Sequence, residues 1–145
     1  MPTVNDVLRL KDRRVIYVEI SDSVLLAVKT MNENRVGAVV ILDIGELAGI
    51  FTERDVLTKI VAAELSPEDT PVSAVMTTPV ICCNLATDID EVAQIMLKRH
   101  IRHLPVRGAE DHIVGMISIH DINAFNVGQK QATIENMADY ILGRG

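Results

Sequence analysis

The sequence predicts an α/β (α+β) fold made of two similar halves that pack on each other about a pseudo-two-fold axis. Short segments rich in β-branched residues alternate with segments whose apolar residues have helical spacing. This order of elements occurs twice within 145 residues, so each half is too small to bury its own apolar sheet. Hydrophobic residues make up 48% of the chain and aromatic residues only 3%, so the shared core must consist of aliphatic side chains and methionine.

The first repeat is expected over residues 1–65. It begins with a polar stretch. The helical spacing of Val4, Val7 and Leu8 in this stretch predicts a short helix with one apolar face for docking. The elements then follow in the order strand, helix, strand, strand, helix. Strands are expected at 15–20, 36–42 and 47–51, and helices from an N-cap at Ser21 or Asp22 to about Asn34 and from about Glu53 to Glu64.

The second repeat is expected over residues 72–127, after a polar linker at 66–71 that contains two prolines. It begins with a short helical turn at 72–76 and then repeats the order of elements. Strands are expected at 80–85, 101–106 and 113–117, and helices around 89–96 and from about Ile119. Residues 128–145 lie outside the repeat and predict an added C-terminal helix, which is a candidate surface for a dimer or a protein partner.

The two repeats stay in register over most of their length. Met31 and Met96 lie 65 positions apart, whereas Asp55 and Asp121 lie 66 positions apart. The one added residue falls in the hairpin turn of the second repeat, where insertions are tolerated. The equivalence of the two halves predicts two equivalent clefts where they meet.

A turn with a hydroxyl and a carboxylate three residues apart occurs once in each repeat, as Gly49-Ile-Phe-Thr-Glu-Arg-Asp55 and Gly115-Met-Ile-Ser-Ile-His-Asp121. One interpretation is a capping box that satisfies the free N–H groups of a helix start. The other is a ligand site. The same helix start suits a phosphate, and the carboxylate is able to accept hydrogen bonds from two vicinal ribose hydroxyls. Both interpretations remain open from the turn alone.

The doubled turn, together with Val-Met-Thr at 75–77 and Arg-His-Leu-Pro-Val at 102–106, resembles the cystathionine-β-synthase (CBS) domain family. The resemblance runs from about Val4 to Phe125 and is to a stand-alone tandem CBS pair. It implies two β-α-β-β-α units that form two clefts. It also implies an adenosyl ligand such as AMP, ADP, ATP, NAD(H) or S-adenosylmethionine, and association into a disc-like homodimer.

The resemblance also implies roles for individual residues. The carboxylates of Asp55 and Asp121 would bind ribose, and the residues around them would bind phosphate or the adenine edge. Gly37 and Ala38 stand where the second repeat has its basic pair, so two unequal sites are expected. Thr52 and Ser118 would contact ribose or the α-phosphate, Arg54, His120, Arg102 and His103 would face phosphate, and backbone groups near Ile16-Tyr17 and Ile81-Cys82 would read adenine.

Composition excludes several classes of function. A net charge of -6 disfavours a nucleic-acid-binding surface, because such binding relies on clustered cations. No apolar run reaches the ~20 residues of a membrane span, and the first residues lack the apolar core of a signal peptide, so a cytoplasmic protein is expected. The neighbouring Cys82 and Cys83 lie in an apolar stretch and are interpreted as buried, inert thiols.

The chain shows no catalytic motif and no metal-binding motif, so an enzyme is not expected. The leading hypothesis is a regulatory, energy- or redox-sensing module that binds an adenine nucleotide and passes its state to an unknown protein partner. One alternative is a ligand-free scaffold for dimerisation, in which the two turns are only capping boxes. A nucleotide hydrolase is the least favoured alternative.

Overall fold

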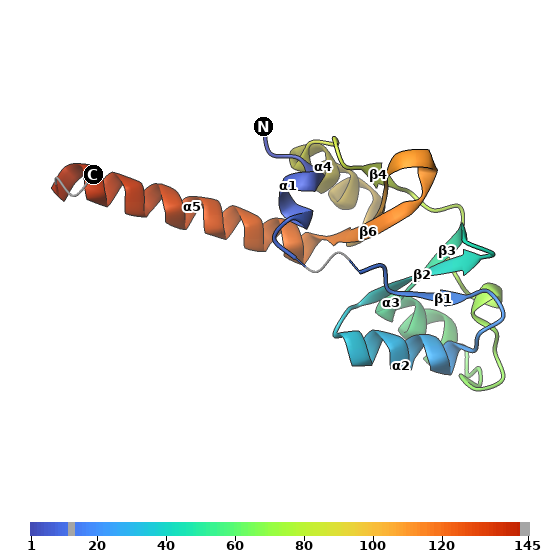
Figure 1. Cartoon of the computed structure of the whole chain (residues 1–145). Coiled ribbons are helices and arrows are strands. Elements are labelled where there is room, and N and C mark those ends of the chain that lie inside the picture. The colour runs from blue at the N-terminus through green and yellow to red at the C-terminus, as the bar shows by residue number, and fades with distance from the viewer. Residues whose placement is uncertain (12–13, 143–145) are drawn as a thin grey trace.

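The structure is a computed structural model that describes residues 1–11 and 14–142. Two similar three-stranded sheets, one from each repeat, pack together to form the body of the molecule, and one long helix extends away from it (Figure 1). The predicted fold of two β-α-β-β-α units about a pseudo-two-fold axis is confirmed.

The first half contains a sheet in the order β1-β2-β3, in which β1 is parallel to β2 and β2 is antiparallel to β3. Ser23 is the N-cap of the first helix and accepts a hydrogen bond from the N–H of Leu26, so the predicted caps at Ser21 and Asp22 are wrong. The elements are β1 (Tyr17–Glu19), α2 (Val24–Asn34), β2 (Ala38–Asp43), β3 (Glu46–Thr52), α3 (Glu53–Asp55) and the π-helix η1 (Val56–Val61).

The second half repeats this topology in the order β4-β5-β6, with the same parallel and antiparallel pairings. Each hairpin also has an irregular register at the equivalent place, between Ile41 and Leu42 in one half and between Val106 and Arg107 in the other. The elements are β4 (Cys83–Asn84), α4 (Ile89–Arg99), β5 (His103–Arg107), the 3-10 helix η3 (Ala109–Asp111), β6 (Ile113–Ser118) and α5 (Ile119–Leu142).

The strands that open each repeat are shorter than predicted. The patterns at 15–20 and 80–85 predict longer strands than the observed β1 and β4. Both are edge strands with a partner on one side only, so a ladder forms only where they meet that partner. Val15 and Ile16 of the first stretch and Val80 and Ile81 of the second lie outside the strands and line the clefts described below.

The two halves exchange their leading helices. The helix α1 (Val4–Leu8) packs into the core of the second half, while the 3-10 helix η2 (Val72–Ala74) packs into the core of the first. Backbone bridges attach both segments: Thr3 pairs with Asp88, and Ser23 pairs with Pro71. The core of each half is therefore completed by the leading segment of the other repeat, and this exchange ties the two halves into one unit.

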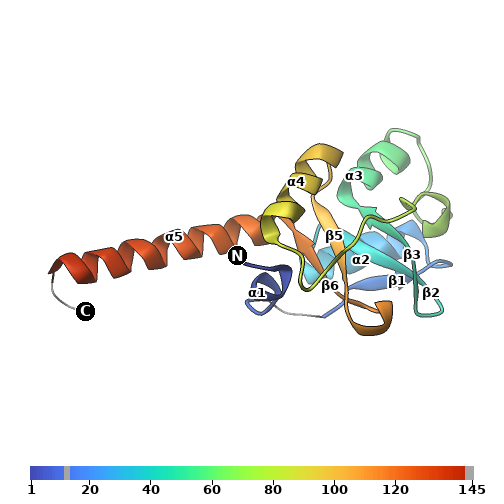
Figure 2. The ribbon, with the colours of Figure 1, turned by 90° about the horizontal axis from the view of Figure 1, so that it is seen from above.

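The predicted C-terminal helix is present, but it continues the last helix of the second repeat, because α5 runs without a break from Ile119 to Leu142. Gly128 lies inside this helix with no other atom within 4 Å of the position that a Cβ would occupy. The first turns of α5 pack against α1 and α4, whereas the rest projects from the body (Figures 1 and 2). Among the described residues, no helix combines the length and the apolar character needed to cross a membrane.

Candidate functional site

Two clefts lie between the halves, and each is lined by residues of both halves. We call them the Asp121 cleft, of about 400 Å³, and the Asp55 cleft, of about 430 Å³, after the carboxylate that lines each one. Both volumes lie in the range of small-molecule sites. The doubled turns predicted from the sequence therefore lie at two separate clefts.

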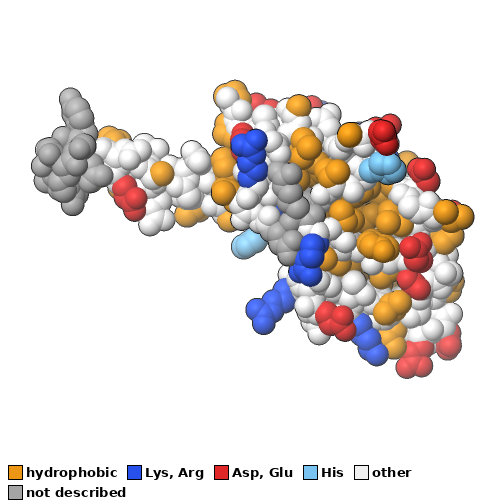
Figure 3. All heavy atoms as spheres, in the orientation of Figure 1, with side chains coloured by type: hydrophobic (Ala, Val, Ile, Leu, Met, Phe, Trp, Pro, Cys, Tyr) orange, Lys and Arg blue, Asp and Glu red, His pale blue; other side chains and the backbone are white. Residues whose placement is uncertain are grey.

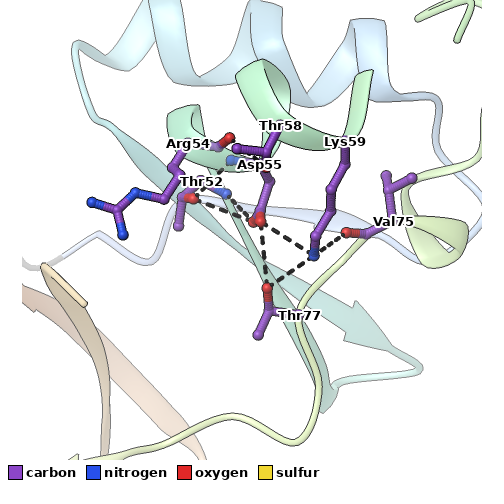
Figure 4. Close-up of polar contacts among 7 residues, drawn as sticks. All are labelled: Thr52, Arg54, Asp55, Thr58, Lys59, Val75 and Thr77. Atoms are coloured by element: carbon purple, nitrogen blue, oxygen red, sulfur yellow. Dashed lines mark hydrogen bonds and ion pairs between the residues drawn. The ribbon is translucent and has the colours of Figure 1, made fainter. Parts of the chain in front are cut away.

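Asp55 sits at the start of α3 with only 7% of its surface exposed. Its Oδ2 accepts hydrogen bonds from Thr52 N at 2.9 Å and Thr52 Oγ1 at 3.2 Å, and Thr52 Oγ1 in turn accepts from Asp55 N. Its Oδ1 lies 3.2 Å from Lys59 Nζ and 3.5 Å from Thr77 Oγ1 (Figure 4). Both oxygens of this carboxylate thus have protein partners.

Asp121 holds the equivalent place at the start of α5. Its Oδ2 accepts hydrogen bonds from Ser118 N at 2.9 Å and from Lys11 Nζ at 2.7 Å, while Ser118 Oγ accepts one from Asp121 N. Lys11 Nζ also donates to Met116 O at 2.9 Å. Within residues 1–11 and 14–142, no hydrogen bond to Asp121 Oδ1 is present. The capping interpretation is confirmed in both repeats, but only Asp121 keeps an oxygen with no such partner.

Each carboxylate is paired with a lysine that comes from a different part of the fold. Lys59 follows Asp55 by four residues on the same helical segment and also donates to Val75 O, which holds the leading segment of the second repeat (Figure 4). Lys11 belongs to the exchanged N-terminal segment. The sequence signalled the first pair through its i, i+4 spacing. No sequence pattern signals the second, because its partners meet only after the exchange of leading helices.

A wall shared by the two clefts contains Glu53, Arg102 and His103. A Cβ at Gly37 would lie 2.9 Å from Glu53 Oε1 and 3.5 Å from His103 Cε1, so the glycine leaves room for both side chains. Burial lowers the pKa of His103, while the nearby Glu53 carboxylate opposes that shift. The basic pair predicted for the second repeat is thus placed where it faces both clefts.

The remaining candidate side chains divide between the clefts. Arg54 lines the Asp55 cleft, and its Nη1 donates to His100 O at 3.0 Å across the junction of the halves. His120 lines the Asp121 cleft. Ile81 of the second half lines the Asp55 cleft, while Ile16 of the first half lines the Asp121 cleft.

Tyr17 and Cys82 line neither cleft, although their neighbours do. Cys82 is half-buried, and burial raises the pKa of its thiol, an effect that Arg107 opposes. Cys83 is buried, and the pKa of its thiol is raised to about 12, mainly by burial. The interpretation of inert, buried thiols therefore fits Cys83 better than Cys82.

Sequence reasoning missed several cations at the Asp121 cleft. Lys11, Arg14 and Arg35 line it, yet none belongs to a recognisable motif. Arg35 ends α2 in the left-handed conformation with φ 54°, which turns the chain toward the cleft. Across the described part of the chain, no group of three or more His, Cys, Asp or Glu side chains is arranged to hold a metal ion.

The chain is similar in sequence to proteins of one known family. The sequence model of the CBS domain matches residues 4–62 and 72–127. The mitochondrial CBS domain-containing protein CBSX3 of Arabidopsis thaliana is 33% identical over an alignment of 150 positions, which covers 97% of this chain and 72% of that protein.

Two solved structures share most of this arrangement. A protein with CBS domains from Burkholderia ambifaria is 34% identical, with a TM-score of 0.84 over 88% of this chain and 95% of that chain. The CBS domain pair of protein MJ0100, in complex with 5′-methylthioadenosine and S-adenosyl-L-methionine, is 26% identical, with a TM-score of 0.77 over 88% of this chain and 98% of that chain.

Proposed function

Because the chain belongs to the CBS domain family and carries two copies of the domain, we propose that it is a regulatory module that binds adenosyl ligands in its two clefts. One observation carries the proposal. Each cleft presents a carboxylate and a hydroxyl at a helix start on one half, and an apolar segment of the other half faces them. This arrangement suits a ribose on the carboxylate and a purine against the apolar segment.

The ligand would act by holding the two halves together. In the Asp121 cleft, ribose binds Asp121 Oδ1, the base lies near Ile16, and phosphate reaches Arg102 on the shared wall. The bound form is stabilised by RT ln(1 + [L]/Kd), which is about 2.7 kcal/mol at a hundredfold excess over Kd. The related pair of MJ0100, which binds two adenosyl compounds, supports this class of ligand for the present chain.

A thermal unfolding series tests the proposal. Wild-type protein is heated alone and with AMP, ATP, NAD(H) or S-adenosylmethionine, and uridine monophosphate serves as the base control. At least one adenosyl ligand should raise the melting temperature, and Asp121→Asn, which keeps the size of the side chain, should reduce that rise. The absence of any adenosyl-dependent rise in the wild type would rule out the ligand-binding function.

A scaffold function is the second candidate, and one observation favours it. Capping bonds, Lys59 and Thr77 already engage Asp55 on both of its oxygens, so that turn has a complete structural explanation. A scaffold predicts that Asp55→Asn and Asp121→Asn lower stability by the same amount with and without nucleotide. A regulatory module predicts that ligand widens the difference between wild type and Asp121→Asn.

The proposal includes a homodimer and a protein partner that reads the ligand state. The projecting part of α5 supports the dimer, because hydrophobic side chains lie exposed along it (Figure 3). Val127, Ile134 and Ile141 follow one another at intervals of seven and are 62%, 66% and 75% exposed. This spacing is that of one seam of a helix pair, so we assign the face to a second copy of the chain.

A further inference from the structure

The two clefts differ in charge, although their volumes are similar. Four cations and two carboxylates among the described residues line the Asp121 cleft, whereas two of each line the Asp55 cleft. With histidines neutral, the linings carry +2 and zero, in a chain whose net charge is -6. Arg102 and Glu53 are common to both linings, so the difference comes from Lys11, Arg14 and Arg35 on one side and Arg54 on the other.

We propose that the Asp121 cleft selects the more highly phosphorylated adenine nucleotide, while the Asp55 cleft takes an adenosyl ligand with little negative charge. The inference rests on the proposed function and assigns a ligand class to each cleft. Every added phosphate brings negative charge to the ligand, which a lining of +2 attracts and a neutral lining does not. The cations that discriminate come from three places: the exchanged N-terminal segment, the approach to β1, and the end of α2.

The carboxylates also make the two clefts unequal for a ribose. A ribose that enters the Asp121 cleft finds Oδ1 without a partner among the described residues, and Lys11 is able to stay on Oδ2. A ribose that enters the Asp55 cleft must share or displace the contacts of Lys59 and Thr77 with Oδ1. Binding at Asp55 therefore starts with a cost in lost hydrogen bonds that binding at Asp121 avoids.

The ammonium groups differ in placement as well. Lys11 lines its cleft while its Nζ is held by Asp121 and Met116 O. Lys59 does not line the Asp55 cleft, and its Nζ is occupied by Asp55, Val75 O and Thr77. Lys11 thus contributes positive charge to the lining of the Asp121 cleft, whereas Lys59 binds groups of the protein outside the lining of the Asp55 cleft.

Calorimetric titration with AMP, ADP and ATP, in EDTA and at low and high salt, tests the inference. In the wild type, one class of site should prefer ATP over AMP by about tenfold at low salt, and salt should reduce that preference. Arg35→Gln should lower the preference by about threefold, because one of the discriminating charges is lost. Lys29→Gln on the same helix is the matched control, since Lys29 is exposed and lines neither cleft.

The location of each class follows from two further variants. Asp121→Asn should weaken the class that prefers ATP, and Asp55→Asn should weaken the other class. Equal affinity for AMP and ATP at both classes, or an ATP preference that falls in Arg54→Gln and stays in Arg35→Gln, would overturn the inference alone. Binding of S-adenosylmethionine without any binding of AMP, ADP or ATP would also overturn the inference alone. Failure of all four, and of NAD(H), to bind would overturn the proposed function, and the inference with it.

Discussion

Lys11 and Asp121 lie 110 positions apart in the sequence, yet Lys11 Nζ is 2.7 Å from Asp121 Oδ2. The contact exists because α1 leaves its own repeat and packs in the core of the second half. The partner of Asp55 in the first half is instead the local Lys59. The equivalent carboxylates of the two repeats are therefore paired with lysines from unrelated parts of the fold.

Replacing Lys11 with methionine should lower the free energy of unfolding by about 0.5 to 1 kcal/mol, as expected of a partly exposed ion pair. The lysine side chain is 33% exposed and that of Asp121 16%, so solvent screens the contact in part. Urea unfolding of Lys11→Met at low and high salt measures the effect, which should shrink as salt rises. Lys29→Met is the control, and an equal loss in that variant would contradict the pairing.

Gly49 predicts a strong steric effect. A Cβ at this position would lie 2.5 Å from Met76 Sδ, because the exchanged segment packs directly on the strand. Gly49→Ala should destabilise the fold by about 1 to 3 kcal/mol through overpacking. Gly128→Ala, a helix position with open space around it, should instead stabilise by about 0.5 to 1 kcal/mol. The added change Met76→Ala should recover part of the loss, and no recovery would argue against this contact.

The two neighbouring thiols should react differently. The pKa of Cys83 is raised to about 12 from an ordinary 9.0, so the folded protein holds this proton where the unfolded chain releases it. Stability from this group is complete below pH 9 and is lost as pH rises from 9 toward 12. Native protein at pH 8 should be alkylated at half-buried Cys82 first, as peptide mass mapping would show. Cys83→Ala should flatten the alkaline fall in stability, and faster alkylation of Cys83 would refute its burial.

His103 should make stability depend on pH on the acid side. Burial holds its pKa below the ordinary 6.5, so the unfolded chain binds this proton at a higher pH than the folded protein. The resulting stability is present above pH 6.5 and is lost as pH falls below 6.5 toward the folded pKa. Nuclear magnetic resonance titration of the imidazole measures that pKa, and a bound phosphate should raise it. An unchanged stability profile in His103→Gln would disprove the linkage.

The exposed face of α5 predicts a change in assembly. Ile134→Lys places a charge at the centre of the seam between two copies and should shift a dimer toward monomer, because burying an unpaired charge is costly. Light scattering after size-exclusion chromatography measures the mass. The matched variant Thr133→Lys changes the neighbouring exposed residue outside that row of seven and should leave the mass unchanged. The same mass for wild type and Ile134→Lys would count against this face as the dimer surface.

Local patterns were enough to predict much of the fold. The helix α2 ends at Asn34 and α5 begins at Ile119, as the spacing of apolar residues and the doubled turn indicated. The features whose bounds differ from the prediction depend on contacts and hydrogen bonds with other residues. The strand β4 is short because only Cys83 and Asn84 pair with β5, and α5 runs through Gly128 because its helical hydrogen bonds outweigh the intrinsic preference of one glycine.

The candidate site was predicted in kind but not in its electrostatics. The motif placed Asp55 and Asp121 at cleft mouths, and both line a cleft. The additional cations could not be found in the same way, because a motif describes neighbours in sequence. Arg35 reaches its cleft only through the left-handed turn that ends α2.

The sequence by itself determined that there are two equivalent units, each with a hydroxyl and a carboxylate at a helix start. Periodicity and helix capping are local effects, and they act in the same way wherever the segment lies. Gly37 and Ala38, in place of a basic pair, also indicated that the two sites are unequal, but only the tertiary structure decided which contacts and charges differ. Packing exchanged their leading helices, brought Lys11 to Asp121 and Thr77 to Asp55, and left the two clefts with unequal charge. Contacts between distant segments depend on which apolar surfaces fit together, and a repeat in the sequence does not specify that choice.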